Sequence, residues 1–459
     1  MVRESALLPP AEPPLARRLG LFDVMMIVMG GIIGSGIFIN PYVVARQIPS
    51  TGLILAAWAV GGLVALLGAF IYGELSTQAS LSGGQYVYLR DAFHPAVAFA
   101  YGWSLLLVIQ SGGMAAVAVT FAKYFCEIAG IGSSDARAAT LAAVVLATLA
   151  TINCLGVRAG STTQNLFMIL KLVAIGALVV FGLQVHSRIE SASLAVVPVR
   201  PGPFGSALIP VFFAYGGWQT ACFVAGEVQE PRKNLPRGLL LGVLGVIAVY
   251  LSVNFVCVRA LGPNGLAMTT TPASAVMRLA LGNVGGQIIA AGIAISTIGF
   301  LSQSMLTAPR VYFAMAEDGL FFKGLARLNS AQVPAFAIAL QGLFAAVIAV
   351  SGRYEQILNY VISVDVLFFA LSAACVFVYR RRPGARASSA SAHQPEADAT
   401  FRLPGHPFTT LFFICACLAV VWSTIVRYPS DSLIGLGIMF SGLPVYFFWR
   451  IRRPRLAKL

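Results

Sequence analysis

The feature that most constrains this chain is a succession of long apolar runs that carry almost no charge. Six uncharged runs reach the roughly 20 residues that a helix needs to cross a bilayer, and they cover 53–72, 138–157, 238–258, 279–309, 333–352 and 407–426. Shorter or interrupted runs cover 21–45, 96–122, 166–184, 205–228, 357–379 and 432–449. Segments rich in Pro, Gly and charge separate the runs, as helix breakers should. The pattern predicts an all-α polytopic membrane protein with 12 transmembrane helices.

The charge distribution supports this arrangement and gives it an orientation. Charged residues make up only 10% of the chain, against about a quarter in a soluble domain. With both termini inside, the cytoplasmic segments hold 20 of the 31 Lys and Arg residues and the outer segments hold 9, while Lys171 and Arg310 fall within or at the end of a span. Cytoplasmic loops carry such an excess of positive charge. The net charge of +14 therefore indicates orientation rather than nucleic-acid binding, and we expect a multi-pass plasma-membrane protein with cytoplasmic termini.

The spans and their connections predict five segments. A cytoplasmic N-terminal tail (1–20) precedes a ten-helix transport core (21–380), and an Ala/Ser-rich, flexible cytoplasmic loop (381–406) leads to two additional transmembrane helices (407–450) and a cytoplasmic tail (451–459). The Pro-rich start lacks the pattern of a cleaved signal peptide. Seven cysteines lie almost entirely within apolar runs and form no CxxC pair, so we expect neither a disulfide framework nor a metal site, and no cofactor.

Two spans carry glycine interruptions near their middles. The first has Gly34, Ser35 and Gly36, and the sixth has Gly216 and Gly217. Each glycine destabilises a helix by roughly 1 kcal/mol relative to alanine, although close helix crossings also use glycine. If the chain holds two inverted five-helix repeats, spans one and six correspond, and interrupted helices at corresponding positions indicate a transporter site. Backbone freed within the membrane is tolerable only where a cavity or ligand satisfies it.

The chemistry of such breaks favours a zwitterionic substrate. The helix that restarts after Gly36 points N–H groups and partial positive charge at the break, which suits a carboxylate. Carbonyls before each break, such as those of Ile32 and Phe213, can accept hydrogen bonds from an ammonium. An amino acid would match both groups.

Several motifs together resemble the amino acid–polyamine–organocation transporter superfamily, and most closely its L-amino acid transporter branch. They are GGIIGSGIF (30–38), YGELSTQASLSGGQYVYL (72–89), GWSLLL (102–107), QNLFMILKL (164–172), FFAYGGW (212–218), GEVQEPRKNLPRG (226–238) and RVYFAMAEDGLFF (310–322), and the likeness runs from about 21 to about 420. It implies the LeuT-type fold, with two inverted five-helix repeats and two further helices. It also implies alternating access, sodium-independent transport of neutral L-amino acids, and a permease or exchanger rather than an enzyme.

The resemblance also implies which residues form the site. The carboxylate would bind at Gly34, Ser35 and Gly36, and the ammonium near the carbonyls of Ile32 and Phe213. The remaining substrate-binding positions are Ile109, Gly113, Val117, Ala214, Gly216 and Thr220, and Phe213 would also gate the site. Gln110 and Gln219 stand where relatives vary, which leaves substrate size open. The tip between spans three and four lacks the cysteine with which animal members bond a glycoprotein, so no disulfide-linked heavy subunit is expected.

Lys171 is the most informative intramembrane charge. It lies between leucines in the fifth span, where a charge costs at least ~3 kcal/mol and usually serves a function. It could stand in for a sodium ion and tie spans one and five together, carry a proton, or pair structurally. Glu74 and Glu227 at the ends of spans are either snorkelling side chains near an arginine or parts of an inner gate. Asp365 lies deeper, and the sequence assigns it no partner.

Other functions fit the sequence less well. A carrier of polyamines or basic amino acids would want a carboxylate beside the breaks, and none is present there, while a proton-coupled carrier stays open. An enzyme is disfavoured because HExxH, GxSxG and clustered His or Cys are absent from the sequence. A sensor would usually carry a larger soluble domain, and a channel does not need paired broken helices.

Overall fold

The computed structural model describes residues 17–78, 83–132, 134–155, 161–186, 201–330, 333–351, 354–381 and 401–452. Most of the predicted N-terminal tail, of the loop before the last two spans and of the C-terminal tail lies outside these ranges. Within them every named element is a helix, and an isolated β-bridge joins Leu19 to Val228. The all-α prediction is confirmed.

The first half of the chain forms the helices that correspond to spans one to five. They are α1 (Leu21–Ile32), α2 (Gly36–Gln47), α3 (Thr51–Gln78), α4 (Gln85–Ala92), α5 (Pro95–Ser104), the π-helix η1 (Leu105–Ile109), α6 (Gln110–Ile128), α7 (Asp135–Cys154) and α8 (Ser161–Gln184). The third span is continuous through η1, a π-helical turn that adds one residue to the regular helix. Neither η1 nor the short helix α4 was expected from the sequence.

The second half repeats this order and adds two spans. It contains α9 (Pro201–Tyr215), α10 (Thr220–Phe223), the 3₁₀ turn η3 (Ala225–Glu227), α11 (Pro231–Ala267), α12 (Pro272–Thr307), α13 (Pro309–Glu317), the 3₁₀ turn η4 (Lys323–Ala326), α14 (Ala335–Ser351), α15 (Tyr354–Arg381), α16 (Phe408–Arg427) and α17 (Pro429–Arg452). In the described ranges, 9 helices are long and apolar enough to cross a membrane, and the bent pair α1 and α2 makes 10. The count of twelve stays a prediction, with α14 and the interrupted α9 as the shorter candidates.

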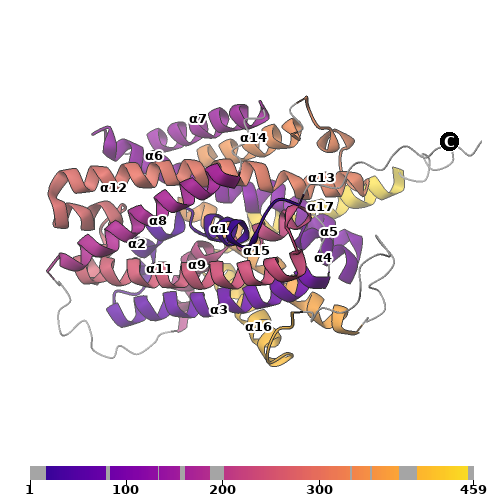
Figure 1. Cartoon of the computed structure of the whole chain (residues 1–459), viewed down its shortest axis with the longest axis horizontal. Coiled ribbons are helices and arrows are strands. Elements are labelled where there is room, and N and C mark those ends of the chain that lie inside the picture. Colours follow the sequence, from indigo (N-terminus) through magenta and orange to yellow (C-terminus); the bar gives the residue numbers. More distant parts are fainter. Residues whose placement is uncertain are drawn as a thin grey trace, which may run out of the picture.

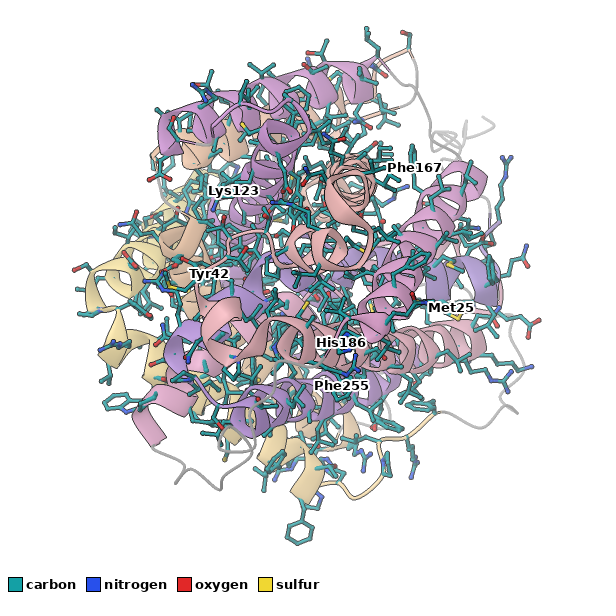
Figure 2. The ribbon with its side chains drawn as sticks, turned by 90° about the vertical axis from the view of Figure 1, so that its left-hand side faces the viewer. Met25, Tyr42, Lys123, Phe167, His186 and Phe255 are labelled. Atoms are coloured by element: carbon teal, nitrogen blue, oxygen red, sulfur yellow. The ribbon has the colours of Figure 1, made fainter. Side chains whose placement is uncertain are left out.

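The helices run roughly along the long axis of the molecule and surround the two broken spans. α3 packs against α11, α7 against α14, and α12 against both α6 and α8, while α1 and α9 lie near the centre of the view (Figure 1). Figure 2 shows the end that carries Tyr42, Lys123 and His186. Large apolar side chains such as Val173, Ile288 and Trp422 are exposed on the outer surface. Such a surface suits lipid, and the broken helices are held inside.

Candidate functional site

The first span breaks where the glycine pattern predicts. α1 ends at Ile32 and α2 begins at Gly36, with a bend of 40° between them. Ile33 leaves the helical region with φ −75° and ψ 76°, and the Gly34 N–H turns back to the Ile32 carbonyl at 2.8 Å. The first N–H groups of α2 have no intrahelical acceptor because they open a helix. The Ser35 hydroxyl is buried and has no hydrogen-bond partner among the described residues.

The sixth span also breaks as predicted, but it satisfies its own polar groups. α9 ends at Tyr215 and α10 begins at Thr220. Gly217 between them has φ +115°, which only glycine adopts readily. Its N–H donates to the Gln219 side chain at 3.0 Å, and its carbonyl accepts from the Thr220 hydroxyl at 2.8 Å. Thr220 and Gln219 therefore close this break rather than standing free in a side-chain pocket.

The two breaks touch each other directly. A methyl group on Gly36 would lie 2.6 Å from the Ala214 Cα, and one on Gly217 would collide with the Gly31 carbonyl. Real Cβ contacts are longer than this, so both positions need glycine for close packing of the two backbones. The predicted residues Gly36 and Ala214 are thus brought together at one crossing, whereas the space beside Gly216 is bounded by carbonyls of its own helix.

Tyr250 of α11 joins the breaks from the side, and the sequence interpretation missed it. Its hydroxyl lies 3.0 Å from the Ile32 carbonyl and 3.0 Å from the Ala214 carbonyl. Its ring packs against Trp58 at 5.6 Å and Tyr215 at 5.0 Å between centroids. The Ile32 carbonyl accepts from the Gly34 N–H and shares the single Tyr250 hydroxyl proton with the Ala214 carbonyl. A lone tyrosine in the apolar run of α11 was the only available signal.

The predicted positions on the third span differ in their surroundings. Ile109 ends the π-helical turn and, like Val117, is buried. Gly113 has open space where a Cβ would stand, with no atom within 4 Å. Phe213 is half-buried near the end of α9, and the Phe300 ring of α12 faces Gly34. Space for a side chain is therefore available at Gly113.

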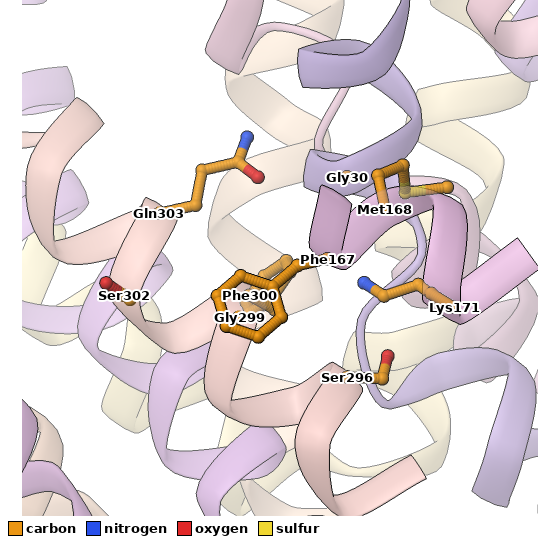
Figure 3. Close-up of a pocket in the computed structure, with 9 residues that line it drawn as sticks. All are labelled: Gly30, Phe167, Met168, Lys171, Ser296, Gly299, Phe300, Ser302 and Gln303. Carbon is orange, nitrogen blue, oxygen red and sulfur yellow. The ribbon is translucent and has the colours of Figure 1, made fainter. Parts of the chain in front are cut away.

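Lys171 reaches the first break from α8. It is 5% exposed, and its amino group donates to the Ile33 carbonyl at 2.5 Å. It lines a cavity of about 30 Å³ between α1, α8 and α12, with Gly30, Phe167, Met168, Ser296, Gly299, Phe300, Ser302 and Gln303 (Figure 3). This volume holds one or two water molecules. The tie between spans one and five that the sequence suggested is present as a direct hydrogen bond.

The two glutamates form ion pairs away from this cavity. Glu74, 1% exposed, accepts two hydrogen bonds from Arg380 and one from the Leu403 N–H, each at 2.7 Å. Glu227 pairs with Arg310 at 2.7 Å. Both glutamates thus have the arginine partner that the sequence anticipated. Glu74 also fastens α15 and the segment before α16 to the C-terminal end of α3.

This combination of fold and site defines a class. Two helices interrupted at corresponding positions of two halves, in contact with each other inside an apolar bundle, are the architecture of a secondary transporter.

The family comparison identifies the chain more closely. The family model for amino acid permeases matches residues 19–445, and the chain belongs to that family of amino acid transporters. The resemblance to the amino acid–polyamine–organocation superfamily, with its L-amino acid transporter branch, is confirmed.

Individual relatives span most of the chain. The serine/threonine exchanger SteT of Bacillus subtilis is 28% identical over 96% of this chain and 98% of its own. The b(0,+)-type amino acid transporter 1 of Homo sapiens is 30% identical over 81% of this chain and 77% of its own. The large neutral amino acids transporter small subunit 2 of Mus musculus is 30% identical over 95% of this chain and 82% of its own.

Proposed function

We propose that the protein is a sodium-independent secondary transporter of neutral L-amino acids, a permease or exchanger working by alternating access. The observation that carries the proposal is the Lys171 amino group on the Ile33 carbonyl, beside Ser296 in the cavity. A fixed ammonium there supplies the positive charge that a bound sodium ion would otherwise supply. Two unit charges 4 Å apart repel by about 4 kcal/mol at an effective dielectric constant of 20. A sodium ion would therefore gain no favourable binding free energy by entering this cavity.

The first break supplies the carboxylate site in this proposal. The amides of Ser35 and Gly36 lie at the start of α2, where backbone N–H groups and the helix dipole both favour an anion. The Gly34 N–H would join them only if its bond to the Ile32 carbonyl opens. The buried, unpartnered Ser35 hydroxyl adds a possible donor. No acidic residue lines the adjoining cavity, so a substrate with a second positive charge would find no counter-ion among the lining residues.

The ammonium site lies at the end of α9. Because the Gly217 N–H donates to Gln219, the Phe213 carbonyl loses its regular helical donor and can accept from an ammonium. The Ile32 carbonyl, bonded by Tyr250 and Gly34, becomes an acceptor only if one of those bonds opens. Gly113, with open space beside it, would receive the substrate side chain, and Phe213 would close over it.

The proposal extends to assembly. One relative is named as the small subunit of a transporter. In this chain the tip between α6 and α7 has no cysteine, and all seven cysteines are free. We therefore expect transport without a disulfide-linked heavy subunit.

Counterflow of a labelled amino-acid mixture in proteoliposomes tests the function. We expect neutral L-amino acids to exchange equally with and without sodium. Lys171→Ala should reduce exchange strongly by releasing α8 from the first break. Leu170→Ala, the neighbouring side chain at 49% exposure, is the matched control and should leave exchange near the wild-type rate. Uptake that rises steeply with sodium, or is indifferent to Lys171→Ala, would contradict the proposal.

A further inference from the structure

Asp365 of α15 is a buried carboxyl group that the transport site does not use. It is 7% exposed, and its Oδ1 atom has no hydrogen-bond partner among the described residues. No ion pair in the described part of the chain involves it. An ionised carboxylate enclosed this way costs several kcal/mol unless a cation or several donors face it. The neutral acid, which carries its own O–H donor, is the form that such surroundings accept.

Asp365 begins a polar stripe that runs along one face of α15. Ser372 and Tyr379 follow at intervals of seven residues, close to two helical turns. This spacing places successive members about 10 Å apart along the helix. Each has a buried side-chain oxygen without a hydrogen-bond partner among the described residues. The stripe leads from the middle of α15 to its end at Arg381, which the charge distribution predicts to be cytoplasmic.

Three tyrosines from other helices face this stripe. Tyr101 of α5 and Tyr72 of α3 lie close enough to Asp365 for their side chains to interact with its charge, and Tyr72 lies beside Ser372. Tyr88 of α4 continues the row, with its ring 6.3 Å from that of Tyr72. All three hydroxyl groups are buried and make no hydrogen bond of normal geometry in the described ranges; the nearest polar side chains are Ser372 for Tyr72 and Cys222 for Tyr88.

The row ends at charged residues near the surface. Tyr88 lies close enough to Tyr379 for the two side chains to interact electrostatically. Tyr379 interacts in the same way with Asp91 and Arg90. The remaining titratable groups around the row are Tyr312 of α13, Cys222 of α10, Cys375 of α15 and Cys417 of α16. None of these is a cation, so among the described residues nothing near Asp365 replaces a proton as its neutralising charge.

Unsatisfied buried hydroxyls at this density indicate ordered water. Each costs about 1–3 kcal/mol when left unpaired, and buried waters normally satisfy such groups. Alternating hydroxyls and waters can pass a proton by successive hydrogen-bond exchange. Water between these groups would take the proton that the Asp365 acid gives up, and water and tyrosine O–H donors would then stabilise the carboxylate that remains.

We propose that Asp365 is a proton-binding site within the membrane, and that it exchanges its proton with the α4 end of the molecule through this row. The inference rests on the proposed transport function and deepens it, since net amino-acid movement is then accompanied by a proton. It assigns that proton to Asp365 and leaves Lys171 as the fixed charge at the first break.

Proteoliposomes with a trapped pH dye test the assignment. Neutral amino acid added outside should change the internal pH for the wild type. Asp365→Asn should reduce this change to that of protein-free liposomes and flatten the pH dependence of net uptake, while counterflow continues. Tyr379→Phe should slow the proton signal, and Tyr360→Phe, which removes a hydroxyl from α15 outside the row, should not. Proton movement unaltered in Asp365→Asn, or absent from an actively exchanging wild type, would overturn the inference.

A second measurement does not depend on transport. The wild-type infrared spectrum should contain a band of a buried neutral carboxylic acid that titrates with pH and exchanges with deuterium, and Asp365→Asn should lack it. If Asp365→Asn does not fold, Tyr379→Phe should slow the deuterium shift of this band while Tyr360→Phe does not. A wild type without such a band refutes the site. Absence of counterflow in the wild type would instead refute the proposed function.

Discussion

Replacing Tyr250 by Phe removes the one hydroxyl group that joins both broken helices. The Ile32 carbonyl keeps the Gly34 N–H as a partner, whereas the Ala214 carbonyl, at the end of α9, loses the tyrosine at 3.0 Å. A buried group left unsatisfied costs about 1–3 kcal/mol. If the substitution destabilises the state in which the two broken helices are in contact and leaves the separated state unchanged, this free energy shifts the equilibrium toward separation by about 5- to 150-fold.

Native-state hydrogen exchange measures this opening equilibrium directly. In Tyr250→Phe, peptides covering 29–38 and 211–220 should exchange faster by the factor above, while peptides from α16 should be unchanged. Tyr215→Phe is the matched control, because its ring packs beside Tyr250 and its buried hydroxyl has no hydrogen-bond partner in the described part of the chain. Removing that hydroxyl should change exchange little. Equal effects of the two substitutions, or no effect of Tyr250→Phe, would refute the role given to the bridge.

Three further predictions concern the crossing, the inner ion pair and the topology. Gly36→Val should abolish uptake while the protein still reaches the membrane, because its side chain would enter the space occupied by α9; normal uptake would refute the site. Glu74→Gln should lower thermal stability in detergent by about 1–2 kcal/mol, less than the 3–5 kcal/mol of a fully buried pair, because the Arg380 side chain is 29% exposed; an unchanged melting temperature would contradict this. Single cysteines at Ser133 and Ser389 should be labelled from opposite sides of the membrane, and labelling from one side would refute the twelve-span topology.

The sequence predicted the helical architecture and both breaks because these features depend on local composition. Apolar length identifies a span, and glycines at matched places identify an interruption. Helix ends were less predictable: the apolar run 238–258 lies inside the longer α11 (Pro231–Ala267), which begins seven residues earlier and is kinked at Gly262. The π-helical turn was missed because no residue type specifies it.

The cross-chain contacts of the site could not be predicted. Tyr250 acts on carbonyl groups of α1 and α9 that only the folded chain brings close, and its neighbours in sequence are ordinary for membrane helices. Lys171 was recognisable because a lone charge in an apolar run is costly wherever it lies, although its acceptor, the Ile33 carbonyl, follows only from three dimensions. Asp365 was noticed for the same reason, but its row of tyrosines comes from four separate helices.

The contact between Gly31 and Gly217 has a mechanical consequence. A methyl group on Gly217 would meet only backbone atoms of Gly31 and Ile32, and one on Gly31 would meet the Gly217 carbonyl oxygen beside the Thr220 hydroxyl, so main chain meets main chain there. Side chains can change rotamer and absorb a displacement, whereas peptide planes in contact transmit it. Movement of either interrupted helix should therefore displace the other in the same step. Fluorescent labels on the two helices should then report a single shared rate, with no species in which only one of them has moved.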